Sequence, residues 1–163
     1  MTTNVERYWS QYLSSVPRGQ EQPSRYVESF SFGFTPADAR EIAQLVVNGI
    51  KTATGSVLWS YEADKKPLPT VGDIWIVTAG SDMPVCIIRT TEVRIIPFDE
   101  VTADYAWEGG EEDRSLASWR EIYREYIERE CQRIGLAPNT KAPLVMERFH
   151  VLYRDPLRGE YES

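Results

Sequence analysis

The chain contains the stretch Gly49-Ile50-Lys51-Thr52-Ala53-Thr54-Gly55-Ser56, which concentrates one amine, three hydroxyls and two glycines. Glycine lets a backbone approach a ligand closely, and hydroxyl and ammonium groups hydrogen-bond to phosphates and other polar small molecules. A lysine next to a threonine also suits nucleophilic catalysis, provided that the lysine is desolvated enough to lose its proton. The same residues are typical of a helix C-cap followed by a polar edge strand, with Lys51 in solvent.

The composition indicates an ordinary globular protein of about one domain. With 163 residues, the chain is long enough to bury a core without metal ions or disulfides. It carries 18 basic and 25 acidic side chains, which gives a net charge of −7. Proteins that bind long duplex DNA draw their affinity from many lysine and arginine contacts with phosphates, so we do not expect duplex DNA as the main partner. A nucleoside, or a short single strand held in a local pocket, is compatible with this charge.

The cysteines and the chain start point to a reduced compartment. Cys86 and Cys131 lie far apart in the sequence and form no Cys-x-x-Cys pair. Such cysteines are typical of reduced core thiols, not of zinc ligands or a redox motif, and they favour a cytoplasmic location. The first residues show no signal-peptide pattern, and no apolar run approaches the ~18 residues that a membrane span needs. We therefore expect no membrane association.

Helix signals occur in three places. The motif Thr3-x-x-Glu6 matches a capping box. Thr35 suits the N-cap of a second helix, and Pro36 suits its first helical position. The longest amphipathic pattern lies in the second half of the chain. The predicted helices cover about residues 3–17, 35–48 and 115–134.

Alternating or continuous apolar runs predict the strands. These runs cover residues 26–32, 52–59, 74–78, 85–96 and 144–153. Between them, we expect a loop over 61–70 and a turn-like acidic segment over 104–113. Because the strands do not alternate regularly with helices, the pattern predicts an α+β fold with a mostly antiparallel sheet or small β-barrel. The expected parts are an N-terminal helix and linker packed on the body (1–24), a main domain (25–153) and a polar tail (154–163).

An acidic cluster precedes the longest predicted helix. It consists of Glu108, Glu111, Glu112 and Asp113. These carboxylates complement the N-terminus of the following helix, or coordinate Mg or Mn, or supply a general base or a partner for a catalytic lysine. Glu108 stands before a Gly-Gly pair, where the backbone can bring a carboxylate close to a ligand.

The last predicted strand contains the single histidine and a pair of opposite charges. His150 lies mid-strand, and no other histidine exists, so a histidine-based triad is not indicated. Glu147 and Arg148 are adjacent and therefore face opposite sides of the strand. One of them points inward and needs a polar partner, for which Lys51 is a candidate.

Several other residues are candidates for ligand binding. Thr52 and Ser56 flank Thr54 and add hydroxyl groups. Arg89 suits a phosphate or carboxylate, although strand arginines are more often solvated. Trp59 and Trp107 suit stacking on a base.

In the order of these motifs, the chain resembles the ASCH family, nucleic-acid-related relatives of the PUA fold. The resemblance covers about residues 29–153. It is carried by Gly49-x-Lys51-Thr52-x-Thr54, Val71-Gly72-Asp73, Ile95 to Val101, Ala106-x-Glu108-Gly109, Asp113-x-Ser115-Leu116-x-x-Trp119-Arg120 and Glu147-Arg148-Phe149.

The resemblance implies a PUA-like small β-barrel with flanking helices and a cleft beside the Gly-x-Lys-Thr-x-Thr segment. Family members are described as RNA-binding modules, as single-strand ribonucleases and as amidohydrolases of N4-acylated cytidine. In the amidohydrolase branch the catalytic set is a lysine, a threonine and a glutamate. Lys51 and Thr54 match the first two, and Glu108 is the favoured glutamate, with Glu111 and Glu112 as alternatives. This chain is longer than that branch and resembles the larger bacterial members.

We therefore expect recognition of a nucleoside or single-stranded RNA, with ribonuclease-like hydrolysis. Alternatives are an amidohydrolase of N4-acylated cytidine-type nucleosides and a non-catalytic RNA-binding or protein-interaction module. The expected catalytic set is Thr54 as nucleophile, Lys51 as its base and Glu108 as the group that orients Lys51. With RNA, Lys51 instead stays charged and the ribose 2′-OH is the nucleophile. We expect no required cofactor, with Mn or Mg compatible, and a monomer or weak homodimer. The expected substrate-binding residues are Thr52, Ser56, Trp59, Arg89, Trp107 and Glu147.

Overall fold

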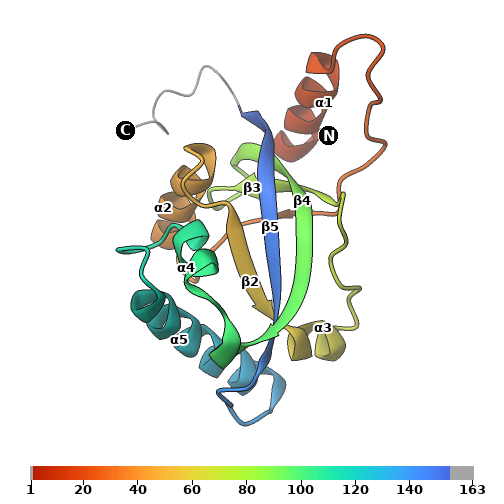
Figure 1. The fold of residues 1–163 in the computed structure, drawn as a ribbon. Coiled ribbons are helices and arrows are strands. Elements are labelled where there is room, and N and C mark those ends of the chain that lie inside the picture. Colours follow the sequence, from red (N-terminus) through yellow and green to blue (C-terminus); the bar gives the residue numbers. More distant parts are fainter. Residues whose placement is uncertain (1, 155–163) are drawn as a thin grey trace. The chain divides into compact units, whose positions relative to one another are not determined.

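The computed structural model describes residues 2–154 (Figure 1). The chain forms two compact units. The first unit comprises the described parts of 1–49, 72–89 and 150–163, and the second comprises 50–71 and 90–149. The long strands β4 (Pro84–Pro97) and β5 (Pro143–Arg154) each run through both units. No helix among the described residues is long and apolar enough to cross a membrane. Apart from Arg154, the predicted polar tail lies outside the described residues.

In the first unit, local capping signals place two helices. Helix α1 (Asn4–Ser15) starts at Thr3, whose hydroxyl accepts a hydrogen bond from the Glu6 amide while the Glu6 carboxylate accepts one from Thr3. This capping box was predicted from the sequence and is confirmed. Helix α2 (Pro36–Val47) starts at Thr35, with Pro36 in the first turn, as expected. In both helices the capping threonine accepts a hydrogen bond from an amide group that has no partner within the helix.

The sheet of the first unit combines a short parallel pair with a longer antiparallel one. Strand β1 (Ser29–Phe30) runs parallel to β3 (Ile74–Thr78), which in turn pairs antiparallel with β4. The prediction of a strand over 26–32 was too long, since only two residues join the ladder. Helix α1 packs its buried side chains on this sheet. The core consists of Val5, Tyr8, Tyr12, Ile74, Ile76 and Ile87.

In the second unit, β2 (Ala53–Val57) pairs antiparallel with β5, and Ala53 lies opposite Arg148. The other elements are α3 (Leu58–Asp64), the 3-10 turn η1 (Phe98–Glu100), α4 (Ala103–Gly109) and α5 (Leu116–Ile134). The core contains buried residues of β2, α4, α5 and β5, with the rings of Trp119 and Tyr123 stacked at 4.3 Å between centroids.

Three sequence predictions in this unit were wrong in whole or in part. The strand expected over 52–59 ends at Val57, and α3 occupies the start of the expected loop at 61–70. The first part of the segment 104–113, expected to be turn-like, belongs to α4. Both helices have seven residues, which is too short for intrinsic propensity to stabilise them, so their helicity depends on tertiary packing.

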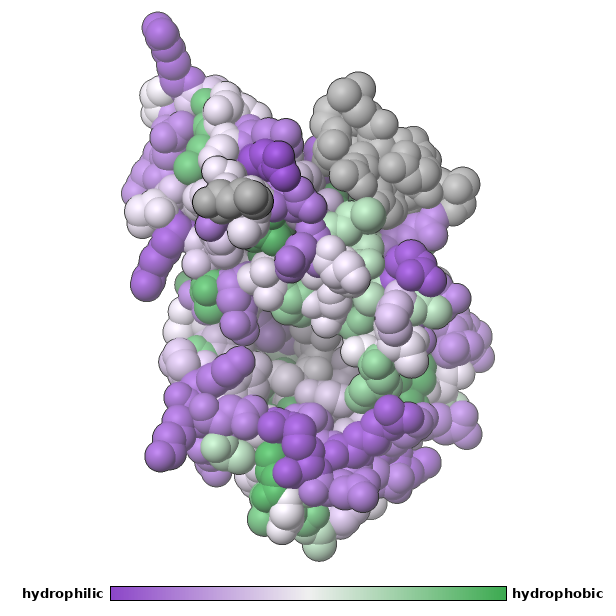
Figure 2. Space-filling model, turned by 180° about the vertical axis from the view of Figure 1, so that it is seen from behind, coloured by the Kyte–Doolittle hydropathy of each residue, from purple (hydrophilic) through white to green (hydrophobic). Residues whose placement is uncertain are grey.

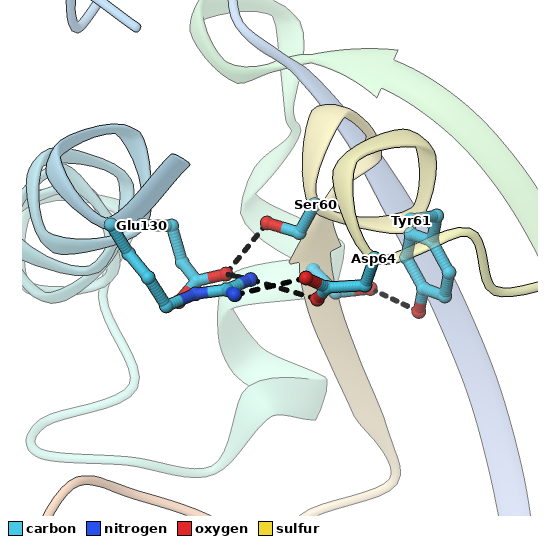
Figure 3. Close-up of polar contacts among 6 residues, drawn as sticks. Ser60, Tyr61, Asp64 and Glu130 are labelled. Carbon is cyan, nitrogen blue, oxygen red and sulfur yellow. Dashed lines mark hydrogen bonds and ion pairs between the residues drawn. The ribbon is translucent and has the colours of Figure 1, made fainter. Parts of the chain in front are cut away.

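Polar contacts with α5 hold α3 in place. Figure 3 shows Ser60 and Asp64 of α3 directed toward α5, where the Ser60 hydroxyl donates to Glu130 at 2.6 Å. Arg133 of α5 donates two hydrogen bonds to the Asp64 carboxylate, at 3.0 and 2.9 Å, and also pairs with Glu130. These contacts keep the pKa of Glu130 below its ordinary value, chiefly through the hydrogen bond from Arg133. This network stabilises α3, which no hydrophobic periodicity in the sequence predicts.

The strands are hydrogen-bonded in the order β1-β3-β4-β5-β2. Only the β1–β3 pair is parallel among the described pairings, so the predicted α+β fold with a mostly antiparallel sheet is confirmed. Over the described residues, the order starts at β1 and ends at β2 without closing into a barrel. Figure 2 shows hydrophilic side chains over much of one face, with hydrophobic residues in small groups, as expected for a chain that is 26% charged.

Cys86 and Cys131 are buried free thiols, as predicted. Burial raises the pKa of the Cys86 thiol to about 12, and burial also raises the pKa of Cys131. Because the thiolate is the reactive form, neither cysteine of the native protein should react quickly with Ellman's reagent at pH 8. Unfolding in urea should release two reactive thiols per chain. Rapid labelling of the native protein would contradict this prediction.

Candidate functional site

Lys51 is a buried cation, with 2% of its surface exposed. Its Nζ donates hydrogen bonds to the Gly109 carbonyl at 3.2 Å and to Oε2 of Glu111 at 3.1 Å. Gly109 is the last residue of α4, so the ammonium lies at the negative end of a helix and beside a carboxylate, both of which favour a positive charge. The interpretation that placed Lys51 in solvent is therefore wrong.

Backbone contacts fix the segment around Lys51. The Thr52 amide donates to the Glu108 carbonyl at 2.7 Å, and the Thr52 carbonyl accepts from the Phe149 amide at 3.0 Å. Gly110, the C-cap of α4, has a positive φ of 74°. A Cβ at this position would lie 2.9 Å from the Ile50 carbonyl oxygen and 3.0 Å from the Lys51 Cα. Only glycine fits between the end of α4 and this stretch of backbone.

Glu108, the glutamate favoured from the sequence, binds an arginine. Arg148 donates from Nε to Glu108 at 2.6 Å, and its Nη1 contacts Glu92. Its guanidinium also lies 4.1 Å from the ring centroid of Tyr105. The hydrogen bond from Arg148 lowers the pKa of Glu92, while the hydrogen bond to Glu108 raises the pKa of Arg148. The carboxylate that the structure pairs with Lys51 is Glu111, one of the two alternatives.

Thr54 lies beside a different carboxylate. In the antiparallel pairing of β2 with β5, Thr54 is directly opposite Glu147, so the two side chains share one face. The buried Thr90 donates its hydroxyl to Glu147 at 3.3 Å. Ala53 and Arg148 occupy the next register position and therefore face the opposite side. The structure thus places Thr54 with Glu147, and Glu108 with Arg148.

Of the other predicted binding residues, three have structural contacts. Thr52 joins the backbone ladder, the Ser56 hydroxyl shares a hydrogen bond with Tyr61 at 2.7 Å, and Trp59 packs against the core of the second unit. Arg89 belongs to the first unit, and its buried Nε has no hydrogen-bond partner within the described part of the chain. His150 is exposed on β5. No cluster of three or more His, Cys, Asp or Glu side chains suited to a metal occurs among residues 2–154.

Trp107 is exposed, with 58% of its surface accessible, and it is covered in part by an arginine that the sequence did not single out. The Arg114 guanidinium lies 3.7 Å from the ring centroid of Trp107. Its Nε donates to the Trp107 carbonyl at 2.8 Å, and its Nη2 donates to the Ile50 carbonyl at 3.4 Å. The contact of Arg114 with Trp107 could not be predicted from the spacing of residues, because it depends on the conformation of the loop between α4 and α5.

The order of motifs around Lys51, α4 and β5 matches a known family along most of the chain. The ASCH domain model matches residues 28–153. The chain belongs to the ASCH domain family. The resemblance identified from the sequence is confirmed.

Solved structures agree with this membership. An ASCH domain from Lactobacillus crispatus JV V101 is 33% identical, with a TM-score of 0.86 over 93% of this chain and 95% of that one. A protein from Enterococcus faecalis V583 is 30% identical, with a TM-score of 0.82 over 96% of this chain and 93% of that one. No curated protein matches this ASCH domain.

The close fit at Gly110 can be tested against a second glycine of the same domain. Gly110→Ala introduces both a strained positive φ and the clash with the Ile50–Lys51 backbone. Gly135 also has a positive φ, of 80°, but a Cβ there meets nothing within 4 Å. We expect Gly135→Ala to lower the free energy of unfolding by about 1 kcal/mol and Gly110→Ala by about 2–4 kcal/mol. If both variants lose the same free energy of unfolding in urea, the close contact between Gly110 and the Ile50–Lys51 backbone does not constrain the site.

Proposed function

We propose that this ASCH domain recognises single-stranded RNA or its nucleosides at Lys51 and cleaves RNA in a ribonuclease-like reaction. The observation that carries the proposal is the buried ammonium between the end of α4 and Glu111. A buried ion pair contributes little net stability to a fold, because desolvation of its charges costs several kcal/mol. Membership of a family with RNA-binding character supports the choice of ligand.

The Gly109 carbonyl and the Glu111 carboxylate, which both accept from Lys51, differ in how easily a ligand can replace them. The Gly109 carbonyl belongs to the helix end, which the backbone contacts fix. Glu111 lies beyond α4, and 23% of its side chain is exposed. A phosphate oxygen of RNA is an anionic acceptor like the Glu111 carboxylate. In this proposal the phosphate takes the place of Glu111 on Nζ, so the buried ammonium exchanges one anionic partner for another.

The ion pair makes Lys51 a hydrogen-bond donor and a positive charge, which suits phosphoryl chemistry better than the role of a base. The ribose 2′-OH attacks the adjacent phosphorus, the bond to the 5′ oxygen breaks, and the products are a 2′,3′-cyclic phosphate and a 5′-hydroxyl. Lys51 stabilises the charge that develops on the phosphorane oxygens. Thr54 and Glu147 share one face of the β2–β5 pair. In this proposal Thr54 positions the ribose, the Glu147 carboxylate accepts the 2′-OH proton, and the leaving 5′ oxygen takes a proton from water.

The net charge of −7 limits the footprint of such a ligand. An acidic body repels a long polyanion, so we propose contacts with only a few phosphates. Each phosphate contact with a single strand contributes about 0.7 to the slope of log affinity against log salt. The proposed site therefore fits a short segment of RNA, with a shallow salt dependence.

The test compares binding and cleavage of a short oligouridylate by variants of Lys51. Lys51→Met removes the charge, and Lys51→Met combined with Glu111→Gln also removes the charge that would be left unpaired. Loss of a charge-assisted hydrogen bond should weaken binding at least about tenfold in fluorescence anisotropy and should abolish cleavage. The exposed Lys141 provides the control Lys141→Met, which should bind like the wild type.

Two further arms decide between chemistries. A DNA oligonucleotide of the same sequence should stay intact, because it lacks the attacking hydroxyl. Acetate release from N4-acetylcytidine that depends on Thr54 would instead assign the site to the amidohydrolase alternative. Unchanged RNA affinity in the folded Lys51 variants would overturn the proposal.

A further inference from the structure

The Trp107 ring is an unusual surface feature, since aromatic side chains usually bury most of their area. Its neighbours in α4, Tyr105 and Ala106, are buried in the core of the second unit, whereas more than half of Trp107 is exposed. The Arg114 guanidinium stacks on the ring at 3.7 Å from its centroid. The ring and the guanidinium thus form a layered pair at the surface.

The position of Arg114 is fixed by its backbone and by two carbonyl groups. Arg114 has a positive φ of 65°, a conformation that is strained for any residue with a side chain. Its side chain bridges the Trp107 and Ile50 carbonyls. Backbone strain of this kind tends to occur at functional sites. Because the Arg114 guanidinium stacks on the Trp107 ring, its fixed position also restricts the orientation of that ring in the unliganded protein.

This layered pair adjoins the segment that carries Lys51. The Arg114 guanidinium contacts the carbonyl of Ile50, the residue directly before Lys51. Trp107 lies two residues before Gly109, whose carbonyl accepts from Nζ. The stacked pair and the buried ammonium are therefore joined through the same two short backbone segments.

We propose that Trp107 and Arg114 form a nucleobase-stacking subsite next to Lys51, and this inference rests on the proposed function. One base of a single strand stacks on the exposed surface of the indole, and the phosphate next to that base reaches Lys51. Stacking needs only the π-face that every base has, so the subsite binds a base without reading its sequence. The positive charge of Arg114 strengthens the stack through a cation–π contact and attracts the adjacent backbone.

The test measures anisotropy of short fluorescent oligoribonucleotides with three variants. Trp107→Leu removes the aromatic face and should weaken binding about tenfold or more, whereas Trp107→Phe should retain most of the affinity. Arg114→Lys keeps the charge but loses the planar group, and should fall between the two. Phe34→Leu, at an exposed aromatic residue of the first unit, should bind like the wild type. Circular dichroism and urea unfolding verify that each variant is folded.

The ligand can be varied in the same experiment. An oligonucleotide with one abasic nucleotide should lose affinity for the wild type but not for Trp107→Leu, while uridine, cytidine and adenosine oligomers should bind similarly. Wild-type affinity in Trp107→Leu, together with weakened binding in the Lys51 variants, would overturn the subsite and leave the proposed function intact. Weakened binding in Trp107→Leu with no effect at Lys51 would instead overturn the proposed function.

Discussion

The ion pair between Lys51 and Glu111, closed by the Gly109 carbonyl, is the interaction on which the candidate site depends. An ammonium can be buried only where oxygen atoms replace water around it. The end of α4 supplies one such oxygen, and the loop after it supplies the other. The hydrogen bond from Thr52 to Glu108 and the close fit at Gly110 bring these segments together. The position of the Lys51 Nζ atom therefore depends on the backbone geometry of these segments and on the charge of Glu111.

Lys51 and Arg148 are cations of the second unit that lie near α4, and their surroundings give them different roles. Arg148 is bound by Glu108 and Glu92 and stacks on Tyr105. This arrangement neutralises the guanidinium, and we interpret it as a brace between β5 and α4. The carboxylate of Glu111, which pairs with Lys51, is partly exposed. A ligand that carries an anionic oxygen can compete with that carboxylate, which is why we assign recognition to Lys51.

Local signals in the sequence were sufficient for the capped helices and the long strands. Thr3, Thr35 and Ser115 each accept a hydrogen bond at the start of a helix, and such caps are encoded within four residues. Helices α3 and α4 were missed because their stability comes from distant groups, such as Arg133 and Glu130 for α3. The motif order was enough to identify the family, while the open order of the sheet required the structure.

The candidate site was predictable in its parts but not in its pairing. The sequence indicated Lys51 as a candidate site residue, and a partner for a catalytic lysine was one of the three roles considered for the acidic cluster. It could not decide between Glu108 and Glu111, because positive φ angles at Gly110 and Glu112 redirect the chain between them and the α5 N-cap. The same loop carries Arg114 to Trp107. Contacts made by a short irregular loop leave no period in the sequence.

A double-mutant cycle between Lys51 and Glu111 tests the central claim most directly. The free energy of unfolding is measured in urea for the wild type, Lys51→Met, Glu111→Gln and the double variant, with Glu112→Gln as the exposed neighbouring control. We predict a coupling energy of about 1–3 kcal/mol for the pair and none between Lys51 and Glu112. Additive effects at Lys51 and Glu111, within about 0.5 kcal/mol, would contradict the account, because the buried ammonium would then not depend on that carboxylate.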